Sequence, residues 1–383
     1  MAEERRISKR GFISRCAAFA AVVVVLASVS VACGAEKKIE EKPATSQNVA
    51  MDAYNLRMQG KADEAKTLLE EAIAQDPNNA AAHYELARTQ WHMALGNPKN
   101  LEGDFGDALQ SIEKAVENDP GNVIYPFFEG HVASMLAYIS AMTEDQPGTK
   151  ENLARACGAF ESALKLKPDY PQAMLYLVEL YSTYPEDEGG DISKAEEYAG
   201  QLEAMDDVLG AKAQSLLSEK DPGFWKGILE SNPGNADVLE ELGKAYLVAD
   251  KVDDAVSCFE EAIRINPEKT YLFLDLCRYH TFSAMGAMRS ENDELLKTVC
   301  TSGDAAVTRY IESEPILPML AHALGIQYKL TSALGDEEKA QALVDRAETL
   351  DPYFSKATGA PNPDLFIPPG EVSQNHGYLM RPF

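Results

Sequence analysis

The sequence predicts an all-α protein, a right-handed superhelical solenoid built from antiparallel helix pairs. A nineteen-residue sequence motif with two alanines and a proline in fixed places recurs along the chain, at 62–80, 105–123, 153–171, 251–269 and 336–354. A second helical pattern precedes each copy. Units of this kind stack on their neighbours and form one continuous array. No alternating apolar and polar stretch is long enough to predict a sheet.

Each copy of the motif predicts the second helix of a pair. Two alanines about two turns apart let a neighbouring helix approach closely, and a large apolar residue between them fills the remaining space. In the clearest copy these residues are Ala255, Phe259 and Ala262. Pro267 follows them, and a proline cannot continue a helix. The first helix of this pair is predicted over 236–250.

The pair at 236–267 resembles a tetratricopeptide repeat. It carries the Leu-Gly-(x2)-Tyr, Ala-(x3)-Phe, Ala and Pro pattern of that family at Leu242, Gly243, Tyr246, Ala255, Phe259, Ala262 and Pro267. The first unit and the last keep several of these positions. The units between them include a degenerate stretch at 208–234 and a divergent one at 270–315. We expect about six to seven helix pairs over 49–352.

The N-terminal 33 residues have the pattern of an export signal. Five basic residues precede an apolar run at 17–32, which is short for a membrane span, and Cys33 follows it. Val31-Ala32-Cys33 resembles a bacterial lipobox, which implies that Cys33 becomes a lipid-modified first residue. Simple cleavage near Ala32 and an uncleaved anchor stay open, as do the twin-arginine and Sec routes. Residues 34–48 have the polar composition of a flexible tether.

These features predict an exported protein that a lipid holds at the periplasmic or outer face of a bacterial membrane. The chain has 35 basic and 61 acidic residues, for a net charge of −26. So acidic a protein repels nucleic acid and anionic lipid headgroups, and we expect neither as a ligand.

No sequence pattern predicts catalysis. The chain lacks the HExxH, GxSxG, P-loop and dinucleotide-binding motifs, and its six histidines are scattered. We therefore expect no enzyme, no cofactor and no metal site. Disulfides are permitted in an exported protein, and the first candidate pair is Cys277 and Cys300 in the divergent unit. The alternative is that the cysteines of the repeats are small core residues.

The resemblance to tetratricopeptide repeats implies that the first helix of each pair lines a concave groove. The positions that point into the groove in that family carry many aromatic and basic residues here. They are Tyr54, Arg57, Tyr84, Arg88, Trp91, His92, Phe127, His131, Lys244, Tyr271, Arg278 and Phe282. Aromatic and arginine side chains often anchor interfaces, so we expect these residues to bind a partner. The alternative for Trp91, Phe127 and Phe282 is packing under the long inserts.

These expectations combine in a non-enzymatic scaffold of the cell envelope that holds a partner protein or peptide in the groove. The alternative is a solute-binding accessory lipoprotein, similar to the tetratricopeptide component of TRAP-type transporters, which would use the apolar helix at 123–142. The tail at 353–383 is rich in proline and glycine, and we expect it to be extended. We favour a tail that caps the last repeat. A position in the groove or in another subunit stays open, and so does an oligomer.

Overall fold

The computed structural model describes residues 46–218, 220–357 and 361–372. Within these ranges the chain forms sixteen α-helices, four short 3₁₀-helices and no strand. The predicted export signal, Cys33 and most of the predicted tether lie outside the described residues. In the part that is described, no helix combines the length and the apolar character that crossing a bilayer requires.

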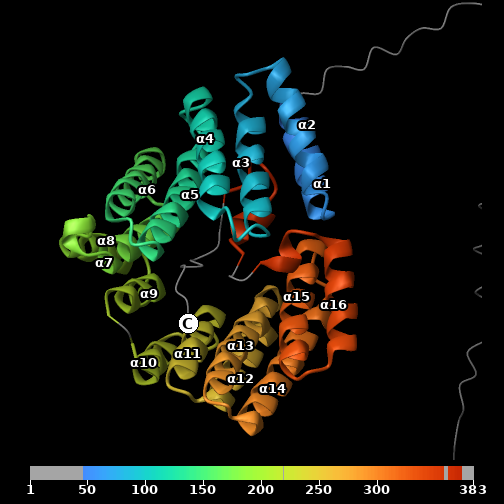
Figure 1. Ribbon diagram of the computed structural model, residues 1–383. Helices are drawn as coiled ribbons and strands as arrows, with labels where there is room; N and C mark the ends of the chain where they lie inside the picture. Colours follow the sequence, from blue (N-terminus) through green and yellow to red (C-terminus); the bar gives the residue numbers. More distant parts are fainter. Residues whose placement is uncertain (1–45, 219, 358–360, 373–383) are drawn as a thin grey trace, which may run out of the picture. The chain divides into compact units, whose positions relative to one another are not determined.

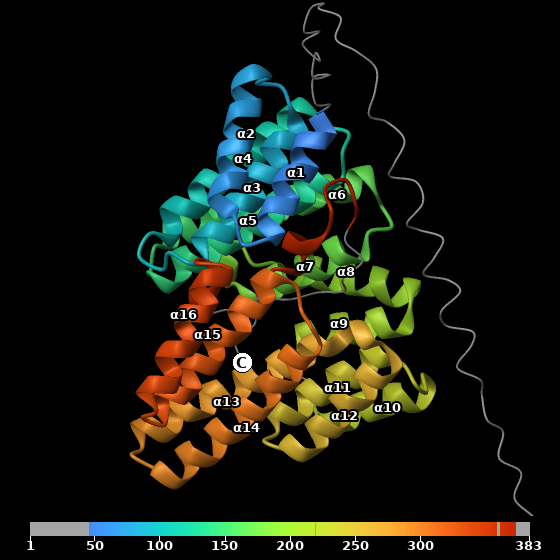
Figure 2. The same cartoon turned by 90° about the vertical axis from the view of Figure 1, so that its right-hand side faces the viewer.

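Most helices follow one another as antiparallel pairs joined by short connections (Figures 1 and 2). Seven pairs pack closely in the described ranges: α1 (Ser46–Met58) with α2 (Ala62–Gln75), α3 (Ala80–Ala94) with α4 (Leu101–Asn118), α5 (Ile124–Met142) with α6 (Gln146–Leu166), α7 (Pro171–Thr183) with α8 (Ile192–Met205), α11 (Ala236–Val248) with α12 (Val252–Ile265), α13 (Leu272–Arg289) with α14 (Asp293–Glu312), and α15 (Leu317–Ala333) with α16 (Glu337–Leu350). The predicted all-α solenoid of helix pairs is confirmed.

The regular pairing is lost in the region that the sequence marked as degenerate. There α9 (Asp207–Leu217) packs on α7 and α8, whereas α10 (Pro222–Ser231) packs on α11. Two short 3₁₀-helices, η1 (Glu186–Glu188) and η2 (Pro267–Tyr271), lie in connections between helices.

Small residues set the spacing of the helices within the pairs. Nine of the ten repeated alanines are fully buried, and the exception, Ala72, is half-buried. At Gly243 of α11, an added Cβ atom would lie 2.3 Å from Cε1 of Phe259 on α12. Gly130 of α5 faces the ring of Phe160 in the same way, at 2.7 Å. The helices of these two pairs therefore approach each other as closely as the repeated motif predicts.

The first two pairs contact the end of the last pair. The hydroxyl of Tyr353, just after α16, donates a hydrogen bond to the Asp63 carboxylate at the start of α2 at 2.8 Å. Nε2 of His92 on α3 lies 2.8 Å from Oδ2 of Asp351. Gly60, at a φ of +74°, leaves room for the last carbonyl oxygen of α16, from which a Cβ atom would lie only 1.8 Å. The two ends of the helix array therefore pack against each other.

The tail beyond α16 runs back along the array. Phe354–Lys356 forms the 3₁₀-helix η3 against α15, and Pro363–Phe366 forms η4. Residues 361–372, which we call the C-terminal segment, contact α1, α3 and α5 and are drawn in red in Figure 1. In the described part of the tail, η3 thus covers the last helix pair, whereas the C-terminal segment lies on the first helices. Residues 373–383 lie outside the described ranges.

Cys277 and Cys300 do not form the predicted disulfide. Both are free and buried, Cys277 on α13 and Cys300 on α14. They belong to one apolar cluster, whose members include Val307 and Leu330. Burial raises the pKa of the Cys277 thiol to about 12. Both thiols act as small core side chains, in line with the alternative interpretation.

Candidate functional site

The groove residues predicted in the first three pairs lie together, and the C-terminal segment covers them. We call the surface made by Tyr54 of α1, Tyr84 and Arg88 of α3, and Phe128 and His131 of α5 the N-terminal face. Apart from Tyr54, which is partly exposed, these side chains are buried. The chain therefore covers this face with its own residues.

A buried charge cluster organises the N-terminal face. One carboxylate oxygen of Glu85 accepts a hydrogen bond from Nε of Arg57 at 3.0 Å, and the other accepts one from Nη1 of Arg88 at 3.0 Å. Burial lowers the pKa of Arg57. Burial acts on Arg88 in the same direction, but the attraction of Glu85 and other groups outweighs it, so the pKa of Arg88 is raised. Two guanidinium groups share one carboxylate, which leaves excess positive charge beneath the face.

The C-terminal segment turns main-chain carbonyl groups towards these donors. Nη2 of Arg88 donates a hydrogen bond to the carbonyl oxygen of Asp364 at 2.7 Å, and another to that of Ile367. The Tyr54 hydroxyl donates one to the carbonyl oxygen of Phe366 at 2.7 Å. Backbone contacts give affinity without selecting particular side chains.

Two side chains of the C-terminal segment add contacts that depend on the sequence. Oδ2 of Asp364 lies 2.9 Å from Nε2 of His131. Leu365 is fully buried in an apolar cluster that includes Tyr84 and Phe128. An acidic residue followed by a leucine therefore fits this part of the face.

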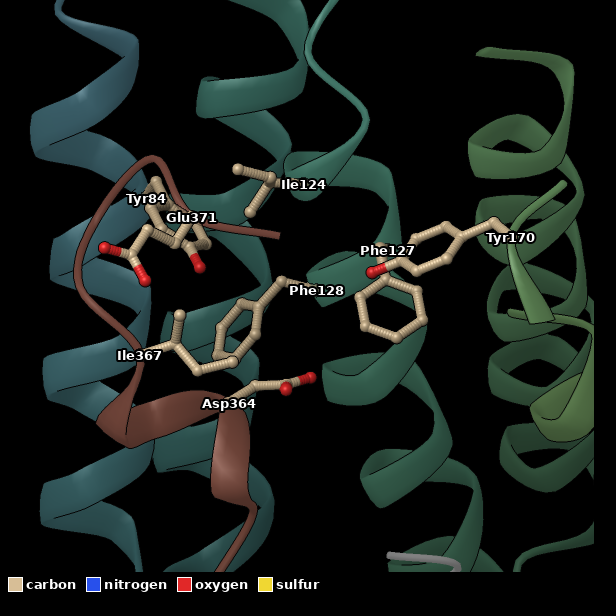
Figure 3. Close-up of a pocket in the computed structure, with 8 residues that line it drawn as sticks. All are labelled: Tyr84, Ile124, Phe127, Phe128, Tyr170, Asp364, Ile367 and Glu371. Carbon is tan, nitrogen blue, oxygen red and sulfur yellow. The ribbon is translucent and has the colours of Figure 1, made fainter. Parts of the chain in front are cut away.

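Little space remains between the segment and the helices. The cavity between them has a volume of about 10 Å³, room for about one water molecule. Figure 3 shows its lining, which consists of Asp364, Ile367 and Glu371 from the segment and Tyr84, Ile124, Phe127, Phe128 and Tyr170 from the repeats. A second cavity, of about 130 Å³, is lined by residues of α14, α15 and the start of α16. Both are smaller than the several hundred Å³ typical of small-molecule sites.

Trp91, His92 and Phe127 belong to the packed interior. Trp91 meets Phe105 edge to face, with ring centres 5.0 Å apart, and the ring centre of Phe127 lies 4.6 Å from that of Tyr170. His92 pairs with the tail, as described above, and its burial lowers its pKa. For Trp91 and Phe127 the structure agrees with the alternative interpretation, which was packing.

Lys244 and Tyr271, in the second half of the array, belong to an ionic network around Glu240 of α11. The Glu240 carboxylate accepts hydrogen bonds from Nζ of Lys244 at 2.6 Å, from Nζ of Lys269 at 2.6 Å and from the Tyr271 hydroxyl at 2.8 Å. Burial would raise the pKa of Glu240, but the two ammonium groups outweigh it and hold the pKa well below its usual range. The charges of these residues are therefore largely matched within the chain.

The helix α13 carries an exposed apolar patch. Phe282 is 61 % exposed, Met285 47 % and Met288 55 %, and we call these three residues the α13 patch. Their spacing of three residues makes them neighbours on the helix surface. Arg278 lies one turn before Phe282 and pairs with the Asp275 carboxylate. Phe282 is a surface residue, whereas the other aromatic residues predicted for the groove are partly or fully buried.

Two residues that shape the N-terminal face were not predicted from the sequence. Glu85 had a local signal, because it lies one helical turn before Arg88. Asp364 had none, because it is 276 residues away from Arg88 along the chain. Among the described residues, no three His, Cys, Asp or Glu side chains are grouped so that they could hold a metal ion.

An array of consecutive, packed helix pairs defines a helical-repeat protein. Residues 56–97 and 236–269 match the tetratricopeptide repeat family. The chain therefore contains tetratricopeptide repeats in these two segments. No match is found among curated proteins.

Several solved structures are similar to this chain at low identity. TTC0263, a thermophilic tetratricopeptide protein of Thermus thermophilus, is 20 % identical, with 61 % of this chain and 97 % of that chain covered and a TM-score of 0.38. MamA is 20 % identical, with 58 % and 93 % covered and a TM-score of 0.28. YrrB, described as a tetratricopeptide protein with an unusual peptide-binding site, is 17 % identical, with 61 % and 93 % covered and a TM-score of 0.28.

Proposed function

We propose that this chain is a non-enzymatic scaffold of the cell envelope that binds a protein or peptide partner on the first helices of its pairs. The tetratricopeptide fold supports a role in protein–protein interaction. One observation carries the proposal: Arg88 and Tyr54 hold the C-terminal segment by its main-chain carbonyl groups. The array thus has the donors and the apolar surface that binding a peptide requires.

We assign the α13 patch as the surface that meets the partner protein. Phenylalanine and methionine are enriched at interfaces, and methionine adapts its shape to different partners. Three large apolar side chains that are neighbours on one helix leave apolar area in water, which association removes. The described residues of the chain leave all three exposed, so this part of the first-helix surface is accessible to a partner.

Charge introduced into the α13 patch tests this assignment. Tagged full-length protein is captured from the membranes of cells that make it, and the bound proteins are compared with those of a Phe282→Asp/Met285→Asp variant. We expect that variant to capture at least about tenfold less of the main bound protein than the unmodified chain does, because central apolar residues dominate interface energies. Ile192→Asp is the matched control, since Ile192 is 53 % exposed on α8. Equal capture by all three proteins contradicts the proposal.

Anchoring in the envelope rests on the export pattern at 1–33 and on the lipobox resemblance at Cys33. Cys33→Ser removes the thiol that the lipid would join. We expect the variant in the soluble fraction and the unmodified sequence in the membrane fraction after cell breakage and centrifugation. A Cys33→Ser protein that sediments with the membranes overturns the lipid anchor.

The solute-binding alternative draws no support from the described residues. It requires an enclosed apolar site of several hundred Å³, whereas the two cavities described above measure about 10 and 130 Å³. A protein or peptide partner therefore fits the described residues better than an enclosed small molecule does.

A further inference from the structure

We propose that the N-terminal face is a recognition site for a partner segment of the type Pro-Asp-Leu-Phe, and that residues 363–366 are its intramolecular ligand. This inference rests on the proposed scaffold function, because it names the chemistry of one partner segment and the surface that takes it. A partner that carries such a segment displaces the chain's own copy and takes over its contacts.

The donors of the N-terminal face are held in place by the repeats themselves. Glu85 binds Nη1 of Arg88 on the same helix and also binds Arg57 on the neighbouring helix. Nη2 of Arg88 then points to the carbonyl oxygen of Asp364. A donor that is fixed before its ligand arrives loses little conformational freedom on binding. A segment from another protein meets the same arranged donors.

The charge beneath the face selects an acidic residue. Arg57 and Arg88 carry two positive charges against the one negative charge of Glu85. The Asp364 carboxylate, which is buried beside His131, brings the second negative charge. A neutral residue at this place would leave a buried positive charge without compensation, which is unfavourable.

The two residues after the aspartate supply apolar contacts. Leu365 is enclosed by the cluster that holds Tyr84 and Phe128. Phe366 meets Phe354 of η3, with ring centres 5.7 Å apart and planes at 69°. Since Phe354 lies against α15 before the C-terminal segment begins, it stays in place for the aromatic residue of a partner.

The turn at 363–366 has local determinants that a partner sequence can reproduce. Pro363 is the first residue of η4, where its fixed φ suits the turn. The side-chain oxygen of Asn362 accepts a hydrogen bond from the Asp364 amide at 2.9 Å. A short Asn-Pro-Asp-Leu-Phe sequence therefore carries the information for both the turn and the contacts.

Covalent attachment favours the chain's own segment over a free competitor. A ligand on a short tether has an effective concentration on the order of millimolar. A free peptide at micromolar concentration does not overcome that advantage. A partner that is also bound at a second surface, such as the α13 patch, gains a comparable advantage and displaces the segment.

The test uses the full chain and a fluorescent synthetic peptide with the sequence of residues 361–372. Leu365→Asp in the chain weakens the attached segment and leaves the N-terminal face unchanged. We expect this variant to bind the peptide at least about tenfold more tightly than the unmodified chain does in fluorescence anisotropy, because the tethered competitor is weakened. Val248→Asp is the control, since Val248 is 63 % exposed at the end of α11, outside the N-terminal face and the C-terminal segment, and it should bind as the unmodified chain does.

A second change tests the face itself. Tyr54→Phe, added to the Leu365→Asp chain, removes the hydroxyl that donates to the main chain of the segment. We expect peptide binding to weaken about threefold to tenfold, as for the loss of one hydrogen bond. A peptide with asparagine in place of Asp364 should also bind more weakly. Unchanged binding in both experiments overturns the assigned contacts.

Two outcomes overturn the proposal as a whole. A folded Leu365→Asp chain that does not bind the peptide shows that the segment is only a structural cover. Dimers of the unmodified chain that Leu365→Asp abolishes show exchange of the segment between copies instead. In either case capture through the α13 patch is a separate result, so failure here is distinguishable from failure of the scaffold function. If Leu365→Asp does not fold, Asp364→Asn keeps the side-chain shape and takes its place with the same expected results.

Discussion

Glu85 is the residue on which the N-terminal face depends. It is fully buried between two arginines, and its carboxylate supplies the negative charge that keeps both guanidinium groups inside the array. Removing one member of a buried ion cluster is costly, because the remaining charges lose their compensation but stay out of water. The loss of stability on substituting Glu85 therefore shows whether this cluster stabilises the fold more than an exposed surface ion pair does.

We expect Glu85→Gln to lower the free energy of unfolding by about 3–5 kcal/mol, because two buried guanidinium groups then repel each other. Urea unfolding followed by circular dichroism measures this change. Glu70→Gln is the control, since its pair with Lys66 is exposed and is worth at most about 1 kcal/mol. Similar losses for the two variants would contradict the role assigned to Glu85.

Buried histidines make the stability depend on pH. Burial lowers the pKa of His92, and it holds the pKa of His322 well below its usual range. The unfolded chain takes up protons near pH 6.5, about the ordinary value for histidine, whereas the folded chain resists them. The contribution of these groups is therefore fully present above about pH 6.5 and is lost as the pH falls through the folded pKa values.

We expect the urea midpoint to fall as the pH is lowered from about 7.5 to 5, and His322→Gln to make this dependence weaker. The comparison uses the slope with pH, so a constant loss of stability in the variant does not affect it. An identical slope in the two proteins would mean that His322 does not contribute to the effect.

At the scale of helices, the approach of α11 to α12 depends on Gly243. A methyl group there would overlap the Phe259 ring, so we expect Gly243→Ala to cost roughly 1–3 kcal/mol, as other overpacked sites do. Gly200→Ala on α8 is the matched control, because an added Cβ atom meets nothing within 4 Å. Alanine is the better helix former, so the control should gain about 0.5–1 kcal/mol in the same urea experiment. Equal effects would contradict the close approach.

The sequence predicted the helices better than it predicted the binding surfaces. Alanine pairs, Gly243 and the prolines act within one helix or between adjacent helices. Their spacing along the chain is therefore enough to predict the helices and their packing. The positions of Arg88 and His131 on the first helices were predictable from the family resemblance. What covers them was not, because Asp364 and Leu365 lie far along the chain and no local pattern links the two regions. Phe282 shares its residue type with Phe127, and burial alone distinguishes them.

At the scale of the whole described array, contact between its two ends is the distinctive feature. In an open repeat array each unit contacts only its neighbours, and the terminal units are the first to open. Here the contact of Tyr353 with Asp63 and that of His92 with Asp351 tie the first pairs to the end of the last pair. The first pair therefore has a second neighbour that is distant in sequence.

We expect Tyr353→Ala to speed amide hydrogen exchange in α1 and α2, because those helices lose the contact that holds them to the end of α16. Exchange in α11 and α12, which that contact does not involve, is the internal control. Equal protection of α1 and α2 in the two proteins would show that the end contact does not stabilise them.

Synthesis from the N-terminus delays the covering of the N-terminal face, because the C-terminal segment is made long after the first helices. A ribosome releases α1, α3 and α5 long before residues 361–372 exist, so a growing chain has Arg57, Arg88 and the apolar cluster beside them without their cover. The burial of these helices is completed only when residues 361–372 have been made. A product that stops short of residue 361 would present an uncovered apolar and cationic surface, which is what proteases and chaperones recognise as unfinished.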